Sequence, residues 1–140
     1  MPVLINDVPP RCIIQAEAIY HVPVVLILSV MRQENGRNGQ AVKNKNGSYD
    51  LGVMQINTRW LPALSRYGYT QEDLQYDPCK NVMAGTWILA NNIATSNMLW
   101  AGIGNYHSHT PQYNASYQND IYKHYKKISA VLNISTASVS

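Results

Sequence analysis

Two carboxyl groups occupy positions where proton transfer is chemically plausible. The chain has only eight Asp and Glu residues. Glu34 follows a mostly apolar segment and precedes Gly36, and Asp50 lies between a polar stretch and an apolar, strand-like run. Most of the other carboxylates fit a helix cap or solvated positions: Asp77 as a cap, and Asp7, Glu72, Asp73 and Asp120 in polar surroundings.

Glu34 has two reasons to keep its proton near neutral pH. An apolar helix before it indicates a partly desolvated site, which disfavours the ionised form. It also lies in the last turn of that helix, where the dipole presents negative potential. A protonated carboxylic acid can serve as a general acid on a glycosidic oxygen. From spacing alone, a surface glutamate at a frayed helix end is the commoner alternative.

Asp50 suits the complementary role of an ionised carboxylate. Such a group can stabilise an oxocarbenium ion or act as a nucleophile. The alternative is a turn aspartate that bonds its own backbone. The residues alone leave this choice open.

The elements that would position Glu34 are predicted to be helices. After an extended lead-in over residues 1–9, Pro10 suits a helix start, and residues 11–22 form a helix that turns Cys12, Ala16, Ile19 and Tyr20 inward. Residues 22–35 form a second helix, which is apolar all round in its first half and therefore central to the core. Gly36 is expected to end it.

The rest of the chain predicts a small β-element and further helices. Asn46-Gly47 is a strong turn signal, and residues 49–57, YDLGVMQIN, are the better candidate for one strand of a small hairpin. Helices are predicted over residues 59–66, from Asp77-Pro78 to 94, over 99–106 and over 116–132, followed by a frayed tail at 133–140. With no repeat and no linker, residues 1–140 are expected to form one mostly α domain of the α+β class.

Composition narrows the function. A charged fraction of 14% argues against disorder, and a net charge of +3 without a basic stripe gives no reason to expect nucleic-acid binding. The mild positive charge suits an anionic polymer such as cell wall. Ten tyrosines and no phenylalanine suit a groove for a hydroxyl-rich ligand, or tyrosine simply replaces phenylalanine in the core.

The two cysteines and the N-terminus bear on compartment. Cys12 and Cys79 belong to no CxxC pair, and no His/Cys cluster has metal-ligand spacing, so no metal is expected. They form either one disulfide or two separate buried thiols. Residues 1–10 lack the pattern of a signal peptide, and VPVVLILSVM is too short to span a bilayer. The chain is therefore cytoplasmic, or a mature exported form with an added Met1, which we favour.

Three blocks of sequence resemble a known family. MRQENGRNG followed by NKNGSYDLGVMQINTRW resembles the active-site region of the lysozyme superfamily. DPCKNVMAGTWIL and GIGNYHSHTPQYNASYQNDIYKHY resemble its later motifs, in the same order. Together they cover residues 12–125 and are most similar to the small specialised lytic transglycosylases of bacterial type III and type IV secretion, conjugation and pilus systems.

The resemblance implies a fold and a set of site residues. It implies a lysozyme-like fold with a small β-hairpin beside the active-site cleft, and Glu34 as catalytic acid/base. Met54, Gln55 and Asn57 would line the sugar groove, Tyr106 would support the site, and His107 would have a minor binding role. The Cys12–Cys79 pair matches a family disulfide, which implies an oxidising compartment and a periplasmic protein.

The resemblance also implies a reaction. Peptidoglycan would be cleaved at the β-1,4 bond between N-acetylmuramic acid and N-acetylglucosamine, giving a 1,6-anhydro product without any cofactor. Asp50 stands where animal-type lysozymes have their second carboxylate, so hydrolysis is an alternative, as is an inactive wall-binding module. Glycan strands, and components of an envelope-spanning apparatus, are the expected partners of a monomer.

Overall fold

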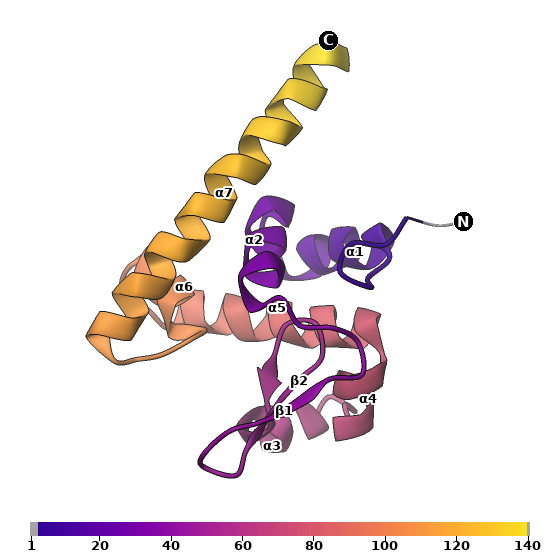
Figure 1. The fold of residues 1–140 in the computed structure, drawn as a ribbon, viewed down its shortest axis with the longest axis vertical. Helices are drawn as coiled ribbons and strands as arrows, with labels where there is room; N and C mark the ends of the chain where they lie inside the picture. The colour runs from indigo at the N-terminus through magenta and orange to yellow at the C-terminus, as the bar shows by residue number, and fades with distance from the viewer. Residues whose placement is uncertain (1–2, 140) are drawn as a thin grey trace.

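The computed structural model describes residues 3–139, with side chains described for residues 3–133. The described residues are mostly helical and include one small sheet, which confirms the predicted class (Figure 1). In chain order the helices and strands are α1 (Pro10–Tyr20), α2 (Val24–Glu34), β1 (Ala41–Lys43), β2 (Tyr49–Leu51), β3 (Ile56–Asn57), the 3-10 helix η1 (Thr58–Trp60), α3 (Leu61–Ser65), α4 (Gln71–Tyr76), α5 (Pro78–Ala94), α6 (Leu99–Asn105) and α7 (Pro111–Val139).

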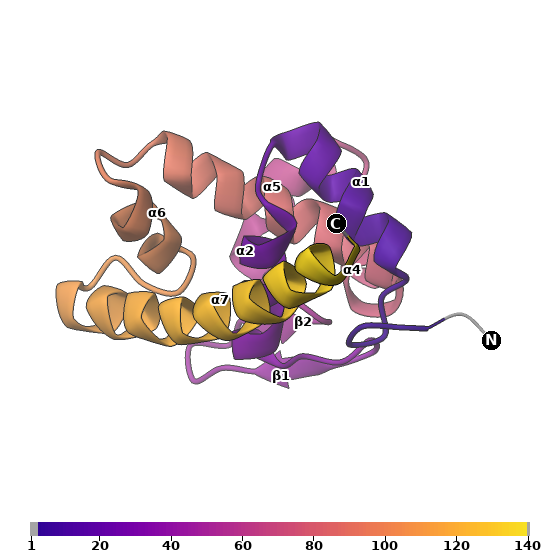
Figure 2. The same cartoon turned by 90° about the horizontal axis from the view of Figure 1, so that it is seen from above.

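The core lies between α2, α5 and the helices that cover them. Helix α2 packs against α7, and α1 packs against α5. Figure 1 shows α7 running from α6 past α2, and Figure 2 shows it lying across α2 from above. Leu26, Ile27, Val30 and Met31 of α2 are buried, as its apolar sequence predicts.

One predicted core position of α1 is wrong. Ile19 is 50% exposed, whereas Cys12, Ile13 and Ala16 form the buried face. With about 3.6 residues per turn, a face centred between Cys12 and Ile13 turns toward Tyr20, not Ile19, at the last turn. Tyr20 accordingly packs, half-buried, against the core.

Helix α2 ends differently from the prediction, although Glu34 is its last residue. Asn35, not Gly36, adopts the left-handed conformation that ends the helix, with φ of 52°, and its N–H donates to the Met31 carbonyl. Asn tolerates this conformation better than most residues. Gly36 instead allows a close approach to the turn after β2, where its N–H donates to the Val53 carbonyl at 3.2 Å. A Cβ at Gly36 would collide with the Gly52 carbonyl oxygen.

The β-element is a three-stranded antiparallel sheet in the order β1-β2-β3, not a hairpin with one long second strand. Residues 52–55 form a turn that divides the predicted strand, because Gly52 takes a φ of +64°. The buried Asn81 of α5 holds this turn: its amide nitrogen donates to the Leu51 and Leu74 carbonyls, and its oxygen accepts from the Met54 N–H at 2.9 Å. The turn places β3 beside β2, with Asp50 opposite Asn57.

The second half of the chain adds one unpredicted helix. This helix is α4, and Thr70 and Asp73 form a reciprocal cap at its start. The sequence had predicted only solvated polar residues here, before the next helix. Asp77 caps α5, as predicted. Cys12 and Cys79 form the disulfide implied by the family resemblance, joining α1 to the first turn of α5.

The last helix is longer than predicted at both of its ends. Helix α7 begins five residues before the predicted start and continues through Val139, into the segment expected to be a tail. Fraying there stays a prediction, and residues 1–2 and 140 of the expected lead-in and tail lie outside the described residues.

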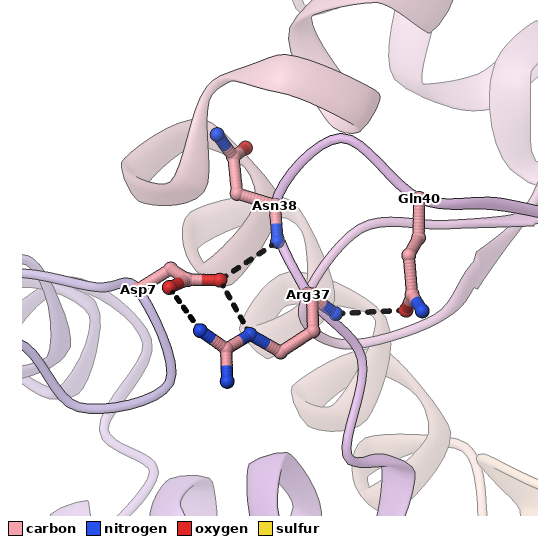
Figure 3. A network of polar contacts seen from close by, with 4 residues as sticks. All are labelled: Asp7, Arg37, Asn38 and Gln40. Atoms are coloured by element: carbon pink, nitrogen blue, oxygen red, sulfur yellow. Dashed lines mark hydrogen bonds and ion pairs between the residues drawn. The ribbon is translucent and has the colours of Figure 1, made fainter.

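An ion pair ties the N-terminal segment to the loop that follows Glu34 (Figure 3). The Arg37 guanidinium donates to both carboxylate oxygens of Asp7, at 2.7 and 2.8 Å, and the Asn38 N–H donates to the same carboxylate at 3.1 Å. These donors, Arg37 first, lower the pKa of Asp7. Gln40 also accepts from the Arg37 N–H, a contact within the loop between α2 and β1 that Asp7 holds from outside.

Candidate active site

A polar cleft of about 230 Å³ lies between the end of α2, the sheet and the end of α6. It contains both candidate carboxylates and four of the five predicted substrate-binding residues. Its lining is Glu34, Asn44, Asn46, Ser48, Asp50, Gln55, Ile56, Asn57, Arg59, Trp60, Ile88, Tyr106 and His107.

Glu34 is a partly buried carboxyl group with one close partner. Burial raises its pKa from 4.5 to about 7, the Tyr117 hydrogen bond opposes this, and the negative charge of Asp50 adds to it. The Tyr117 hydroxyl donates to Glu34 Oε2 at 2.6 Å. Near neutral pH the carboxyl group is therefore about half protonated and can give or take a proton. Desolvation was one of the two causes that the sequence predicts.

Asp50 reaches the same cleft from β2. Its Oδ1 accepts from Asn57 Nδ2 at 3.0 Å, and the same nitrogen contacts Ser48 Oγ at 2.9 Å. Because β2 and β3 place Asp50 directly opposite Asn57, the sheet register fixes this contact. A carboxylate held in this place beside the cleft is positioned to stabilise positive charge that develops on a bound substrate.

Met54 does not line the cleft, contrary to the resemblance-based expectation. Its side chain is fully buried and packs so closely against Gly85 that a Cβ there would collide with the Met54 sulfur. Its backbone carbonyl instead accepts from the Tyr106 hydroxyl at 2.8 Å. Burial raises the pKa of Tyr106 well above 10, so this hydroxyl stays a donor. Tyr106 thus links the end of α6 to the turn before β3.

Gln55 and His107 both line the cleft. Gln55 has a left-handed φ of 53°, and its amide donates to the Gly52 carbonyl at 2.9 Å. His107 is exposed and stacks on the Tyr117 ring, with centroids 5.1 Å apart and planes at 13°. The left-handed backbone conformation of Gln55 is strained for a non-glycine residue, and such strain is common at functional sites.

Tyr117 was not predicted as a site residue. It lies in the helix predicted over residues 116–132, but no sequence pattern placed it beside Glu34. Burial, and then the charge of Glu34, raise the pKa of Tyr117 well above 10, so it donates throughout the working pH range. Its position in the late tyrosine-containing block was the available signal.

Trp60, Arg59 and the polar residues of the β1–β2 turn were also missed as lining residues. Trp60 presents a ring to the cleft and packs edge-on against Trp87, with centroids 6.0 Å apart. An aromatic ring at the edge of a polar cleft suits stacking against a sugar face. The TRW run next to the predicted strand was the signal for both residues.

Tyr117→Phe is expected to shift the pH dependence of any reaction that needs protonated Glu34. In the wild type, the hydrogen bond from Tyr117 lowers the pKa of Glu34. Removing it should therefore raise that pKa above about 7. The alkaline limb of the rate profile should therefore move to higher pH, while turnover falls about tenfold. Rates across pH on purified cell wall measure this. Tyr76→Phe, an exposed tyrosine of α4, is the control, and an unmoved limb in Tyr117→Phe would show that the contact does not tune the acid.

The described residues contain no group of three or more His, Cys, Asp and Glu residues arranged to hold a metal ion. None of their helices is both long enough and apolar enough to cross a bilayer.

Comparison with known proteins agrees with the geometry. The transglycosylase SLT domain model matches residues 11–129. The invasion protein IagB of Salmonella typhi is 32% identical over 124 residues, covering 88% of this chain and 75% of that protein. Protein IpgF of Shigella flexneri is 33% identical over 116 residues, 79% and 76% of the two chains. A peptidoglycan-binding-like protein of Escherichia coli O157:H7 is 31% identical over 87 residues, 61% of this chain and 52% of its own. Because the family model covers most of the chain, this protein belongs to the transglycosylase SLT domain family.

Proposed function

We propose that the protein is a peptidoglycan lytic transglycosylase that cleaves the β-1,4 bond between N-acetylmuramic acid and N-acetylglucosamine. The observation that carries the proposal is Glu34, a cleft carboxyl group whose pKa burial raises to about 7. Membership of the SLT family supports the reaction class. Release of soluble muropeptides from purified sacculi tests it, and intact sacculi after incubation would contradict it.

The proposed reaction needs one acid that becomes a base. The Glu34 proton moves to the bridging oxygen, the bond from that oxygen to C1 of the muramic acid breaks, and positive charge develops at C1. The resulting Glu34 carboxylate then takes the proton of the same sugar's 6-hydroxyl as its oxygen bonds to C1. Glu34 is reprotonated and the product is the 1,6-anhydro sugar. A pKa near 7 suits both half-reactions.

The charge at C1 can be stabilised by the substrate's N-acetyl group or by Asp50. Asp50 favours a second candidate function, hydrolysis as in lysozyme, because its carboxylate lies in the same cleft and is held by Asn57. In that reaction water, not the 6-hydroxyl, attacks C1. An inactive wall-binding module is the third possibility, and the presence of an intact Glu34 in the cleft argues against it.

Asp50→Asn is expected to lower turnover about 100-fold if Asp50 stabilises the charge at C1. The change keeps the side-chain size, so unfolding by urea should differ little from wild type. Initial rates of muropeptide release measure the effect. Glu72→Gln, which neutralises an exposed carboxylate of α4 outside the cleft, should keep the wild-type rate. A near-normal rate for Asp50→Asn would restrict Asp50 to holding Asn57.

We further infer that the enzyme opens the wall locally for an envelope-spanning secretion, conjugation or pilus apparatus, and acts in the periplasm. The similarity to proteins named invasion proteins supports this role, and the Cys12–Cys79 disulfide supports an oxidising compartment. In the source bacterium, a deletion strain should regain assembly of that apparatus with the wild-type gene but not with Glu34→Gln. Equal rescue by both genes would contradict the role.

A further inference from the structure

A second polar pocket continues the cleft past Trp60. Its volume is about 310 Å³, and Arg59 and Trp60 line both hollows, so the two are contiguous. The proton transfers proposed for Glu34 and the charge stabilisation proposed for Asp50 do not involve this pocket. The pocket is lined by Arg59, Trp60, Asn92, Asn105 and His109.

Several polar side-chain groups of this pocket lack partners among the described residues. Within the part of the chain whose side chains are described, the ion pairs belong to Arg37 and Lys80, and the Arg59 guanidinium makes neither an ion pair nor a hydrogen bond. Asn92 is only 7% exposed, yet its side-chain amide has no hydrogen-bond partner among the described residues. Among the described residues, Thr86 Oγ1 is the one fully buried side-chain nitrogen or oxygen without a partner, so the Asn92 amide is open to the pocket and available to a ligand there.

A third amide completes the set of donors. Asn105 Oδ1 accepts from Asn114 Nδ2 at 2.8 Å, an interaction that fixes the Asn105 amide with its oxygen toward the protein. Its amide nitrogen has no partner among the described side chains and is free to donate into the pocket. The exposed imidazole of His109 offers a further N–H.

The chemistry of the pocket therefore selects an anion. Its lining holds a guanidinium, two amides and an imidazole, and it contains no carboxylate. A guanidinium matches a carboxylate through two parallel hydrogen bonds, which gives both charge and direction to the recognition. Because the cleft beside it is proposed to hold glycan, the anion belongs on a substituent of that glycan.

We propose that this pocket binds a carboxylate of the peptide attached to muramic acid, so that Arg59 selects peptide-bearing strands. The proposal rests on the proposed function, since it takes the cleft to hold peptidoglycan. In intact wall the lactyl group of muramic acid is amide-bonded to the peptide, and the available carboxylates belong to the peptide. In strands stripped by an amidase, the lactyl carboxylate is free instead.

The test measures binding on a Glu34→Gln background, where the fragments are not expected to be consumed. Three soluble glycan fragments are compared: one with its peptides, one with the peptide carboxylates capped as methylamides, and one stripped by amidase. Adding Arg59→Gln should weaken binding of the peptide-bearing fragment about fivefold and leave binding of the capped fragment unchanged. Capping should itself weaken binding to the protein with Arg59 by the same factor.

Two further variants separate the pocket from the cleft and from general charge. His109 lines the pocket but not the cleft. His109→Gln should weaken binding less than Arg59→Gln does, and again only for the fragment with uncapped peptides. Arg66→Gln removes an exposed arginine that lines neither hollow, and it should bind all three fragments as the background does. Both positions are exposed, so folding should be retained.

The other outcomes each decide against the proposal. Equal losses on capped and uncapped fragments would show that Arg59 contacts the sugar, and no loss on either would show that it contacts nothing; both overturn the pocket's role. A loss confined to the stripped fragment would assign the anion to the lactyl carboxylate and overturn the assignment to the peptide. If no fragment binds even with Arg59 present, the proposed function fails and the pocket's role fails with it.

Discussion

Glu34→Gln is expected to lower the rate of muropeptide release about 1000-fold while the protein keeps its fold. Glutamine occupies the same space and can still accept from the Tyr117 hydroxyl, but it can neither donate a proton to the glycosidic oxygen nor take one from the 6-hydroxyl. Initial rates on purified sacculi at pH about 6, where most Glu34 is protonated, measure the loss. Glu72→Gln is the matched control, and an unchanged rate in Glu34→Gln would remove the catalytic assignment.

The same variant should be more stable than wild type at alkaline pH. The pKa of Glu34 rises from 4.5 in the unfolded chain to about 7 in the fold, so the native state binds more protons between those two values. Wild-type stability therefore falls as pH rises through that window, by about 3 kcal/mol once Glu34 is fully ionised. Glutamine carries no such cost.

Urea unfolding at several pH values measures this difference. The stability of Glu34→Gln minus that of wild type should be small at pH about 4 and should grow to about 3 kcal/mol at pH about 8. A difference that does not change with pH would mean that burial does not hold the proton on Glu34. A catalytic group held at a cost to stability is a common trade-off in enzymes.

Replacing both cysteines, Cys12→Ala with Cys79→Ala, should lower the free energy of unfolding by about 4 kcal/mol. The disulfide closes a loop across a sequence separation of 67 residues and so restricts the unfolded chain. It also joins α1 to the start of α5, the two helices that pack against each other over the core. Urea unfolding of the oxidised wild type and the double variant gives the difference.

A reducing agent supplies the control for this prediction. It should destabilise the wild type by a similar amount and leave the double variant unchanged. Equal stability of the oxidised wild type and the double variant would contradict the expected contribution of the disulfide. Neither cysteine is among the residues that line the cleft. The double variant should therefore retain activity at low temperature, where it stays folded.

The sequence was most informative where local pattern and local structure coincide. The apolar segment before Glu34 predicts a buried helix that carries Glu34 in its last turn, and α2 does so. Which residue ends the helix was ambiguous, because Asn35 and Gly36 can both adopt the left-handed conformation. The choice depends on the turn at residues 52–55, which needs a glycine at position 36 for its close approach.

The features that were missed depend on contacts between distant segments. Asn81 of α5 holds the turn that divides the predicted strand. Met54, in that turn, packs into the core against Gly85 of α5. The contact between Glu34 and Tyr117 joins positions 83 residues apart and requires the packing of α7 on α2. Helical periodicity predicts the helix that contains Tyr117, but it could not predict that Tyr117 contacts Glu34.

The most direct test of the proposed reaction is the mass of its products in water labelled with heavy oxygen. Sacculi are digested by the wild-type protein, and the released fragments are analysed by mass spectrometry. Attack by the sugar's own 6-hydroxyl predicts 1,6-anhydro ends, lighter than hydrolysis products by one water and free of the label. Reducing ends that carry heavy oxygen would contradict transglycosylation and assign the cleft, with Glu34 and Asp50, to hydrolysis.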